Sequence, residues 1–335
     1  MLALLVFGYL STSQSSPGDR LYMVLHNPYM DQARWTRELS LVKELGFGGI
    51  RLSFGMVDLL NKDMRSMSNF GRRWVDLALR KVKDSGLKLH LTMGDDLPEA
   101  NPAVNMAAHR YLVRKAVEML PPGRLTFDLQ NEPKAFIHLD PAMVQALNRR
   151  AESFIGIWGE LGLQAKGYVL MTPTFHGYNS DWVDGRNVPY ITLAESLKRY
   201  SDRLVKAYDS SMGPWLRNLN PALNLYAPGR YIDAAEFEET MARMILQFLT
   251  KNRVPMPVAI TEFGVFFGSG ISDAAWSEKV ASMAKVLMQM PEVRFAAYYC
   301  LSDDVRYELI TSKGVRNEPK IAALKRSLMK YGLAR

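Results

Sequence analysis

The stretch "DQARWTRELSLVKELGFGGIRLSF", residues 31–54, contains one complete helix-to-strand unit. Its first part has the period of a helix, because four apolar residues fall on one face: Trp35, Leu39, Val42 and Leu45. Gly46 follows them and suits the end of a helix. The short apolar run over residues 48–54 then predicts a buried strand.

This pattern recurs along the chain. Eight apolar runs are candidate strands, at residues 21–27, 48–54, 87–93, 124–132, 166–172, 222–227, 257–264 and 293–302. Stretches with helical period lie between them, at about 31–46, 72–85, 102–119, 141–161, 191–208, 234–252, 273–289 and 319–331. Strands separated by helices pair in parallel.

Eight such units favour closure into a barrel over an open sheet. The alternative is a doubly wound sheet, but no Gly-x-Gly-x-x-Gly motif follows an early strand. The sequence therefore predicts an α/β fold, a single-domain (β/α)8 TIM barrel over residues 20–335.

Residues 1–19 form a separate N-terminal segment in this interpretation. The apolar run in "MLALLVFGYLSTSQSS" is too short to cross a membrane as a helix, and we expect no membrane span. It resembles the apolar part of a signal peptide, yet it lacks the positive leader and the A-x-A cleavage pattern. A signal-peptide remnant and an ordinary N-terminal segment both stay open, and we favour a secreted or periplasmic location over the cytoplasm.

Composition narrows the class of protein. The chain is 48% apolar and 23% charged, as in soluble globular proteins, and its only cysteine, Cys300, rules out an internal disulfide. The net charge of +8 is modest, and lysine and arginine form only short pairs. We therefore expect that the protein does not bind nucleic acid. We also expect a monomer.

Two predicted strands end in a glutamate, Glu132 and Glu262. In a TIM barrel the active site lies at the carboxyl ends of the strands, so both should reach one mouth. Alternation along residues 124–132 places Asp128, Gln130 and Glu132 on the inward side. A buried glutamate is costly unless it is paired or functional, and two at one mouth favour function.

Glycoside hydrolysis is the chemistry that uses such a pair. One carboxyl protonates the leaving oxygen, while the other attacks the anomeric carbon or activates water. Glu262, expected near Arg51 and Tyr226, would stay ionised as the nucleophile, and Glu132 would act as acid and base. Asn131 would hydrogen-bond the sugar 2-hydroxyl. A carboxyl separation of about 5 to 5.5 Å indicates retention of configuration, and one beyond about 6.5 Å indicates inversion.

Three motifs resemble those of the clan A retaining glycoside hydrolases, which include the cellulase-like family 5 and the xylosidase-like family 39. "LQNEP" resembles the acid/base signature and "VAITEFG" the nucleophile signature, 130 residues later. "KELGFGGIRLSF" is similar to the first helix and second strand, whose arginine, here Arg51, supports the nucleophile. The resemblance covers residues 20–335. It implies two-glutamate double displacement on a poly- or oligosaccharide, with no metal and no organic cofactor.

The sequence also departs from the cellulase-like pattern. Asn224 stands where many members have a strand-six histidine, although Tyr226 matches the tyrosine that hydrogen-bonds the nucleophile. Tyr299 takes the place of a strand-eight tryptophan, and no strand-three histidine reaches the mouth. The substrate of the cellulases is therefore not transferred. Further candidate sugar contacts are His26, His176 and Trp182. Asp95 and Asp96 are placed either to bind sugar hydroxyls or to cap the next helix, and capping is favoured.

Three other functions are alternatives to this one. A metal-dependent barrel hydrolase is disfavoured, since the chain has five histidines and no His-x-His. A non-catalytic sugar-binding barrel is disfavoured because both glutamates are present. A transglycosidase uses the same residues, so it stays open, as do the sugar, the linkage and internal or terminal cleavage.

Overall fold

The computed structural model describes residues 16–25, 31–96, 100–133, 140–175, 182–183, 186–187, 206–207, 213–228, 250–251, 254–266, 271–301, 308–311 and 313–334. Every structural statement below concerns these residues.

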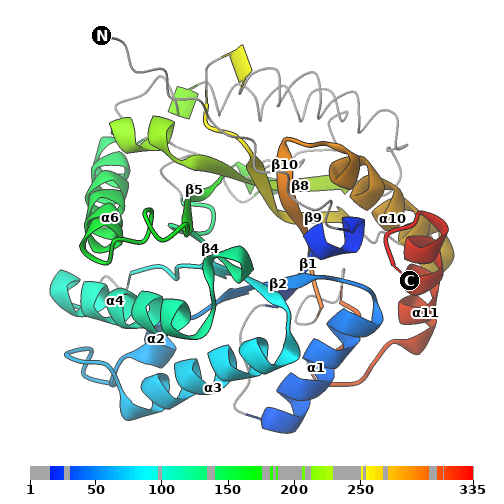
Figure 1. Ribbon diagram of the computed structural model, residues 1–335, viewed down its shortest axis with the longest axis horizontal. Helices are drawn as coiled ribbons and strands as arrows, with labels where there is room; N and C mark the ends of the chain where they lie inside the picture. The colour runs from blue at the N-terminus through cyan, green and yellow to red at the C-terminus, as the bar shows by residue number, and fades with distance from the viewer. Residues whose placement is uncertain are drawn as a thin grey trace.

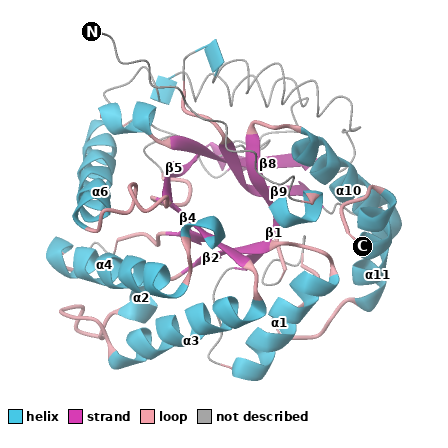
Figure 2. Ribbon diagram, in the orientation of Figure 1, coloured by secondary structure: helices cyan, strands magenta, loops and turns pink. Residues whose placement is uncertain are grey.

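Eight parallel strands form a closed ring with helices outside it (Figures 1 and 2). In chain order they are β1 (Leu21–Leu25), β2 (Gly49–Ser53), β3 (Lys88–Thr92), β4 (Leu125–Asp128), β5 (Val169–Phe175), β8 (Asn220–Pro228), β9 (Val258–Phe266) and β10 (Val293–Tyr298). The ring closes because β1 pairs with both β2 and β10. The predicted single-domain (β/α)8 TIM barrel is confirmed. A separate antiparallel pair, β6 (Trp182–Val183) and β7 (Arg186–Asn187), follows β5.

The helices surround this ring. They are α1 (Gln32–Glu44), α2 (Met56–Leu59), α3 (Asn69–Ser85), α4 (Pro102–Met119), α6 (Pro141–Glu160), α10 (Asp273–Gln289) and α11 (Glu318–Lys330), with 3₁₀ turns η1 (Pro17–Arg20), η2 (Pro122–Arg124) and η3 (Pro214–Asn218). The helices predicted for the corresponding stretches are confirmed. The two predicted at 191–208 and 234–252 lie almost wholly outside the described residues.

Local sequence sets where the long helices begin. Each starts after a side chain that accepts hydrogen bonds from the first turn: Asp31, Ser68, Asn101, Asp140, Ser272 and Asn317. Asn101 caps α4, so the expectation that Asp95 or Asp96 does so is wrong. Just beyond α1, Gly46 has φ +82°, a conformation that glycine adopts without strain.

Most strands begin and end within two residues of their predicted bounds, but β10 ends at Tyr298 rather than 302, and β4 and β5 differ as well. β4 ends at Asp128 rather than Glu132, because the chain turns there and Glu132 has a left-handed backbone with φ 41°. β5 begins at Val169 rather than 166, because the preceding residues form a turn in which Gly167 has φ +84°. Both strands keep their predicted places in the ring.

The core has two parts. The larger lies between strands and helices, where Phe127 of β4 meets Trp158 of α6 edge to face at 5.3 Å. The smaller fills the barrel interior, where Tyr22 stacks on Phe295 at 4.4 Å. It comprises Tyr22, Val24, Met171, Ala222, Ala259, Phe295, Ala297 and Cys300. Nearer the carboxyl ends of the strands the interior side chains are mostly polar and include Arg51, Thr92 and Glu262, so apolar side chains fill only the lower part of the barrel.

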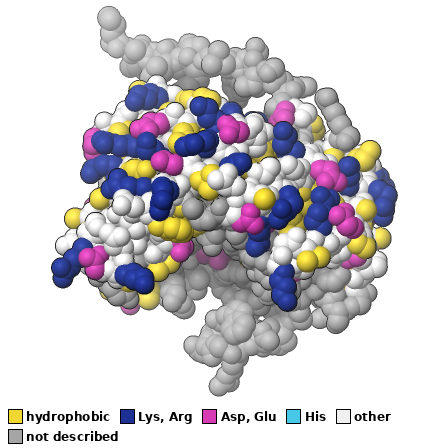
Figure 3. All heavy atoms as spheres, turned by 90° about the horizontal axis from the view of Figure 1, so that it is seen from below, with side chains coloured by type: hydrophobic (Ala, Val, Ile, Leu, Met, Phe, Trp, Pro, Cys, Tyr) yellow, Lys and Arg dark blue, Asp and Glu magenta, His cyan; other side chains and the backbone are white. Residues whose placement is uncertain are grey.

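The face of the molecule seen from below in Figure 1 carries many charged side chains. Over the side of the barrel where α1 and α3 lie, lysine and arginine side chains are spread among acidic ones (Figure 3). In the part of the chain that the structure describes, no helix is both long enough and apolar enough to cross a membrane.

Candidate active site

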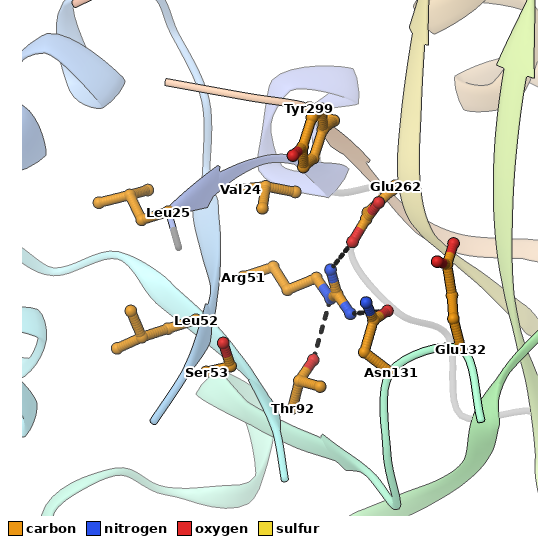
Figure 4. Close-up of a pocket in the computed structure, with 10 residues that line it drawn as sticks. All are labelled: Val24, Leu25, Arg51, Leu52, Ser53, Thr92, Asn131, Glu132, Glu262 and Tyr299. Carbon is orange, nitrogen blue, oxygen red and sulfur yellow. Dashed lines mark hydrogen bonds and ion pairs between the residues drawn. The ribbon is translucent and has the colours of Figure 1, made fainter. Parts of the chain in front are cut away.

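A polar pocket of about 140 Å³ opens at the carboxyl ends of the strands (Figure 4). Its lining comes from β1, β2, β3 and β9 and from the segments that follow β4 and β10: Val24, Leu25, Arg51, Leu52, Ser53, Thr92, Asn131, Glu132, Glu262 and Tyr299. Both predicted glutamates are among these residues. Because their side chains share one cavity, they are available to a single bound molecule.

Arg51 of β2 lies at the centre of the pocket (Figure 4). Its Nη1 makes an ion pair with Glu262, its Nε donates to Thr92 Oγ1 at 2.9 Å and its Nη2 donates to Asn131 Oδ1 at 2.8 Å. Arg51 is 4% exposed and Glu262 6%. A guanidinium held this firmly keeps a buried carboxylate ionised.

A β-bulge aims Glu262 into the barrel. Against β8, Leu223 pairs with Ile260 but Asn224 pairs with Glu262, so β9 carries one extra residue at this point. Thr261 bonds Asn224 inside the barrel, and the next residue, Glu262, bonds Arg51 there as well. Simple alternation would send two consecutive side chains to opposite faces, so the bulge is what brings both inward.

Glu132 approaches from the other side of the pocket. Its left-handed backbone is uncommon for a residue with a side chain, and such strain occurs often at functional sites. Asn224 Nδ2 donates to Glu132 Oε1 at 2.6 Å. Thr261 Oγ1 donates to Asn224 Oδ1 at 2.8 Å, which fixes the amide with its NH₂ group toward Glu132. One glutamate therefore faces a cation and the other a neutral amide.

The orientation of Asn131 follows from the same reasoning. A guanidinium only donates, so the atom of Asn131 that faces Arg51 is its carbonyl oxygen. Asn224 Nδ2 also lies 3.4 Å from that oxygen. The NH₂ group of Asn131 is left to donate toward the cavity.

Four polar residues in or beneath the pocket were given no role in the site from the sequence: Thr92, Asp128, His90 and Thr261. Asp128 Oδ2 accepts from Thr92 Oγ1 and from His90 Nε2, both at 2.9 Å, beneath the pocket. Burial lowers the pKa of His90, so its ring is neutral near neutral pH. The sequence does contain a sign of this arrangement. Alternation along β3 places residues 90 and 92 on the inward side, and alternation along β4 does the same for residues 126 and 128.

A wider groove of about 350 Å³ continues from the pocket between the ends of β2 and β3. It shares Ser53, Thr92 and Asn131 with the pocket and adds Phe54, Gly55, Met56, Val57, Met93, Gly94 and Asp95. Gln130 Nε2 donates to the exposed Asp95 Oδ1 at 2.7 Å. The groove thus has an apolar floor and one acidic polar group.

Asp96, in contrast to Asp95, makes structural contacts. It pairs with Arg150 of α6 and with His109 Nε2 of α4, the latter at 2.8 Å. Burial would raise the pKa of Asp96, but these partners outweigh it and lower that pKa to about 2. Burial lowers the pKa of His109 to about 4. Asp96 therefore ties the loop after β3 to two helices.

The remaining predicted site residues divide into two groups. Tyr299, half-buried, lines the pocket as expected, and Asn224 is fully buried against Glu132. Tyr226 lies in β8 and Trp182 in β6, but their side chains are outside the described residues, as are His26 and His176 entirely. Within the ranges that the structure covers, no group of three or more His, Cys, Asp or Glu residues is placed to hold a metal ion.

Comparison of the sequence with protein families and with curated proteins finds no match. The fold, in contrast, resembles many solved structures. A β-glucosidase from Thermotoga maritima, solved with a substituted glucoimidazole, has a TM-score of 0.57 at 14% identity, covering 90% of this chain and 86% of its own.

Two further structures extend this likeness. An endoglucanase from Thermotoga maritima has a TM-score of 0.56 at 13% identity, covering 92% of this chain and 100% of its own. An endo-β-1,4-glucanase from Xanthomonas axonopodis pv. citri has a TM-score of 0.57 at 12% identity, covering 94% and 99%. The chain thus shares the barrel fold of glycoside hydrolases along nearly its whole length.

Proposed function

We propose that this protein is a retaining glycoside hydrolase that cleaves a poly- or oligosaccharide with Glu262 as nucleophile and Glu132 as acid/base. The observation that carries the proposal is the pair of glutamates in one pocket with unlike partners. Glu262 faces the Arg51 guanidinium, whereas Glu132 accepts from the neutral Asn224 amide. A difference in environment allows one carboxyl group to act as the nucleophile and the other as the proton donor. The glycosidases among the structural neighbours support the same reaction class.

In the first step, an oxygen of Glu262 bonds to the anomeric carbon as the glycosidic C–O bond breaks. The leaving oxygen takes the proton of Glu132. Asn224 already donates to Oε1 of Glu132, so the acid proton is carried on Oε2. The product is a glycosyl ester of Glu262 and a free aglycone.

In the second step, Glu132 removes a proton from water, which attacks the anomeric carbon and releases Glu262 as a carboxylate. The NH₂ group of Asn131, oriented by Arg51, donates to the sugar 2-hydroxyl oxygen. That contact strengthens in the transition state, so it accelerates the reaction rather than only binding substrate.

The test is turnover of neutral and acidic polysaccharides and of aryl glycosides, followed by reducing-end release. Product anomers are read by proton NMR before they mutarotate. We expect the first-formed sugar to have the configuration of the substrate, because the mechanism inverts the anomeric carbon twice. First-formed product of opposite configuration would rule out the covalent ester, and product joined to added sugar would identify a transglycosidase.

The groove between β2 and β3 predicts a preference for extended substrates. Replacing Asp95 with alanine removes a carboxylate that can accept hydrogen bonds from sugar hydroxyls. We expect kcat/KM on long oligosaccharides to fall about 10-fold, since a hydrogen bond to a charged group contributes roughly 1.5 kcal/mol or more. Asp84→Ala, at an exposed position on α3, is the control. An equal loss on small aryl glycosides would show that Asp95 acts elsewhere.

A further inference from the structure

Asp128, the last residue of β4, is a carboxylate that the proposed reaction does not use. It is 0% exposed and lies beneath the pocket. Its Oδ2 accepts from Thr92 Oγ1 and His90 Nε2 at 2.9 Å and from Thr174 Oγ1 at 3.3 Å. Among the residues that the structure describes, Oδ1 has no hydrogen-bond partner. A buried carboxylate costs several kcal/mol unless a charge compensates it, so it requires an explanation.

The charge that compensates Asp128 is Arg51. His90 is not that charge, because burial lowers its pKa and its ring is neutral. The neutral ring donates from Nε2 to Asp128, and Thr126 Oγ1 lies 2.9 Å from the other ring nitrogen, Nδ1, to which it can donate. Arg51 Nη2 lies 3.9 Å from Asp128 Oδ2. Three hydrogen-bond donors and a nearby guanidinium therefore surround Oδ2 of Asp128.

Thr92 joins the two charged groups. Arg51 Nε donates to Thr92 Oγ1, so the hydroxyl proton is free to donate onward to Asp128 Oδ2. On its other side Arg51 pairs with Glu262. One buried positive charge therefore lies between two carboxylates, with Asp128 below and Glu262 at the reaction centre.

We propose that Asp128 is a positioning residue that acts through Arg51 and serves as its counterion in the glycosyl-enzyme. This inference rests on the two-glutamate mechanism proposed above. When Glu262 bonds to the anomeric carbon and the leaving oxygen takes the proton of Glu132, Glu262 becomes a neutral ester. Arg51, 4% exposed, then loses its partner at the reaction centre. Asp128 keeps the guanidinium compensated during that step, so the ester forms without a lone buried charge.

In the free enzyme, Asp128 also weakens the electrostatic effect of Arg51 on Glu262. Because Arg51 interacts with both Asp128 and Glu262, it stabilises the Glu262 carboxylate less than a guanidinium paired with Glu262 alone would. The described titratable and charged groups around Glu262 are Arg51 from β2, His90 from β3, Asp128 and Glu132 from β4 and the turn after it, and Tyr299 after β10. Asp128→Asn removes one of these charges and keeps the shape, since its amide oxygen can accept the three hydrogen bonds.

The first experiment needs no substrate. Carboxyl carbons of glutamate are labelled with ¹³C and titrated by NMR in wild type, Asp128→Asn and Thr92→Val, and the Glu262 signal is identified by its loss in Glu262→Gln. In Asp128→Asn we expect the Glu262 midpoint to move about one pH unit lower, because a neighbouring negative charge is gone. In Thr92→Val, which keeps that charge, it should move by less than half as much. An unmoved or higher midpoint in folded Asp128→Asn overturns the proposal.

Wild type provides a second measurement if Asp128→Asn does not fold. With ¹³C-labelled aspartate and sequential assignment, Asp128 should show a carboxylate chemical shift at pH 7. A protonated Asp128 overturns the proposal.

The kinetic measurement separates this inference from the proposed function. Labelling of Glu262 by activated 2-deoxy-2-fluoro glycosides reports ester formation alone. We expect labelling to be about 10- to 100-fold slower in Asp128→Asn, while hydrolysis of the trapped ester is not slowed. Equal slowing of both steps contradicts the counterion role. If no such glycoside labels the wild-type protein, the proposed function is refuted. The titration still decides whether Asp128 shares the charge of Arg51 with Glu262.

Discussion

Replacing Glu262 with glutamine is expected to lower turnover on every substrate by roughly 10⁵-fold, about 7 kcal/mol in activation free energy. The amide has the shape of the carboxylate and can still accept from Arg51, but it cannot bond to the anomeric carbon as a nucleophile. The loss should therefore appear in kcat, measured with the wild type's own best substrate, with little change in thermal unfolding temperature.

Two comparisons make this result specific. Glu152→Gln, the same change at an exposed position on α6, should leave turnover within twofold of wild type. Glu262→Ala opens space beside Arg51 for a small anion, so azide should restore part of the turnover and yield a glycosyl azide of inverted configuration. Undiminished turnover in Glu262→Gln would refute the mechanism.

Replacing Glu132 with glutamine is expected to depend on the leaving group. Glycosides with poor leaving groups need the acid proton, so their kcat/KM should fall about 10²- to 10⁴-fold. Dinitrophenyl glycosides leave without protonation, so the ester should still form. It should then accumulate, because water has lost its general base, and the dinitrophenolate should appear as a burst followed by a slow phase.

Asn224→Ala is the matched comparison for Glu132. It removes the donor to Oε1 and keeps the carboxyl group. We expect a smaller loss than in Glu132→Gln and no burst, because both proton transfers survive. Equal losses on good and poor leaving groups in Glu132→Gln would assign Glu132 to binding instead of acid catalysis.

The sequence predicts the architecture because each helix and strand is determined locally. The predicted bounds of α4 and α10 match the structure at both ends, since a cap residue and a periodic apolar face define each helix. The approach of Arg51 to Glu262 was also predicted, from the rule that strand ends converge at the mouth of a barrel.

What the sequence did not predict depends on register and backbone conformation. The bulge in β9 exists only relative to β8 and β10, so alternation within β9 alone could not place both Thr261 and Glu262 inside the barrel. The left-handed backbone of Glu132 has no marker in the residues around it. Asp128 was predicted to face inward, but its contact with Thr92 follows from the pairing of β3 with β4.

The ion pair between Arg51 and Glu262 joins residues 211 positions apart, on strands separated in the ring by β1 and β10. In the native ring, the pairing of the first strand with the last is what places these two residues side by side. A chain that ends before β10 would contain Arg51 and both glutamates but would lack the strand that joins β9 to β1, between the two partners of this ion pair. The arrangement of the candidate site therefore depends on closure of the whole ring and is not contained in any one segment of the chain.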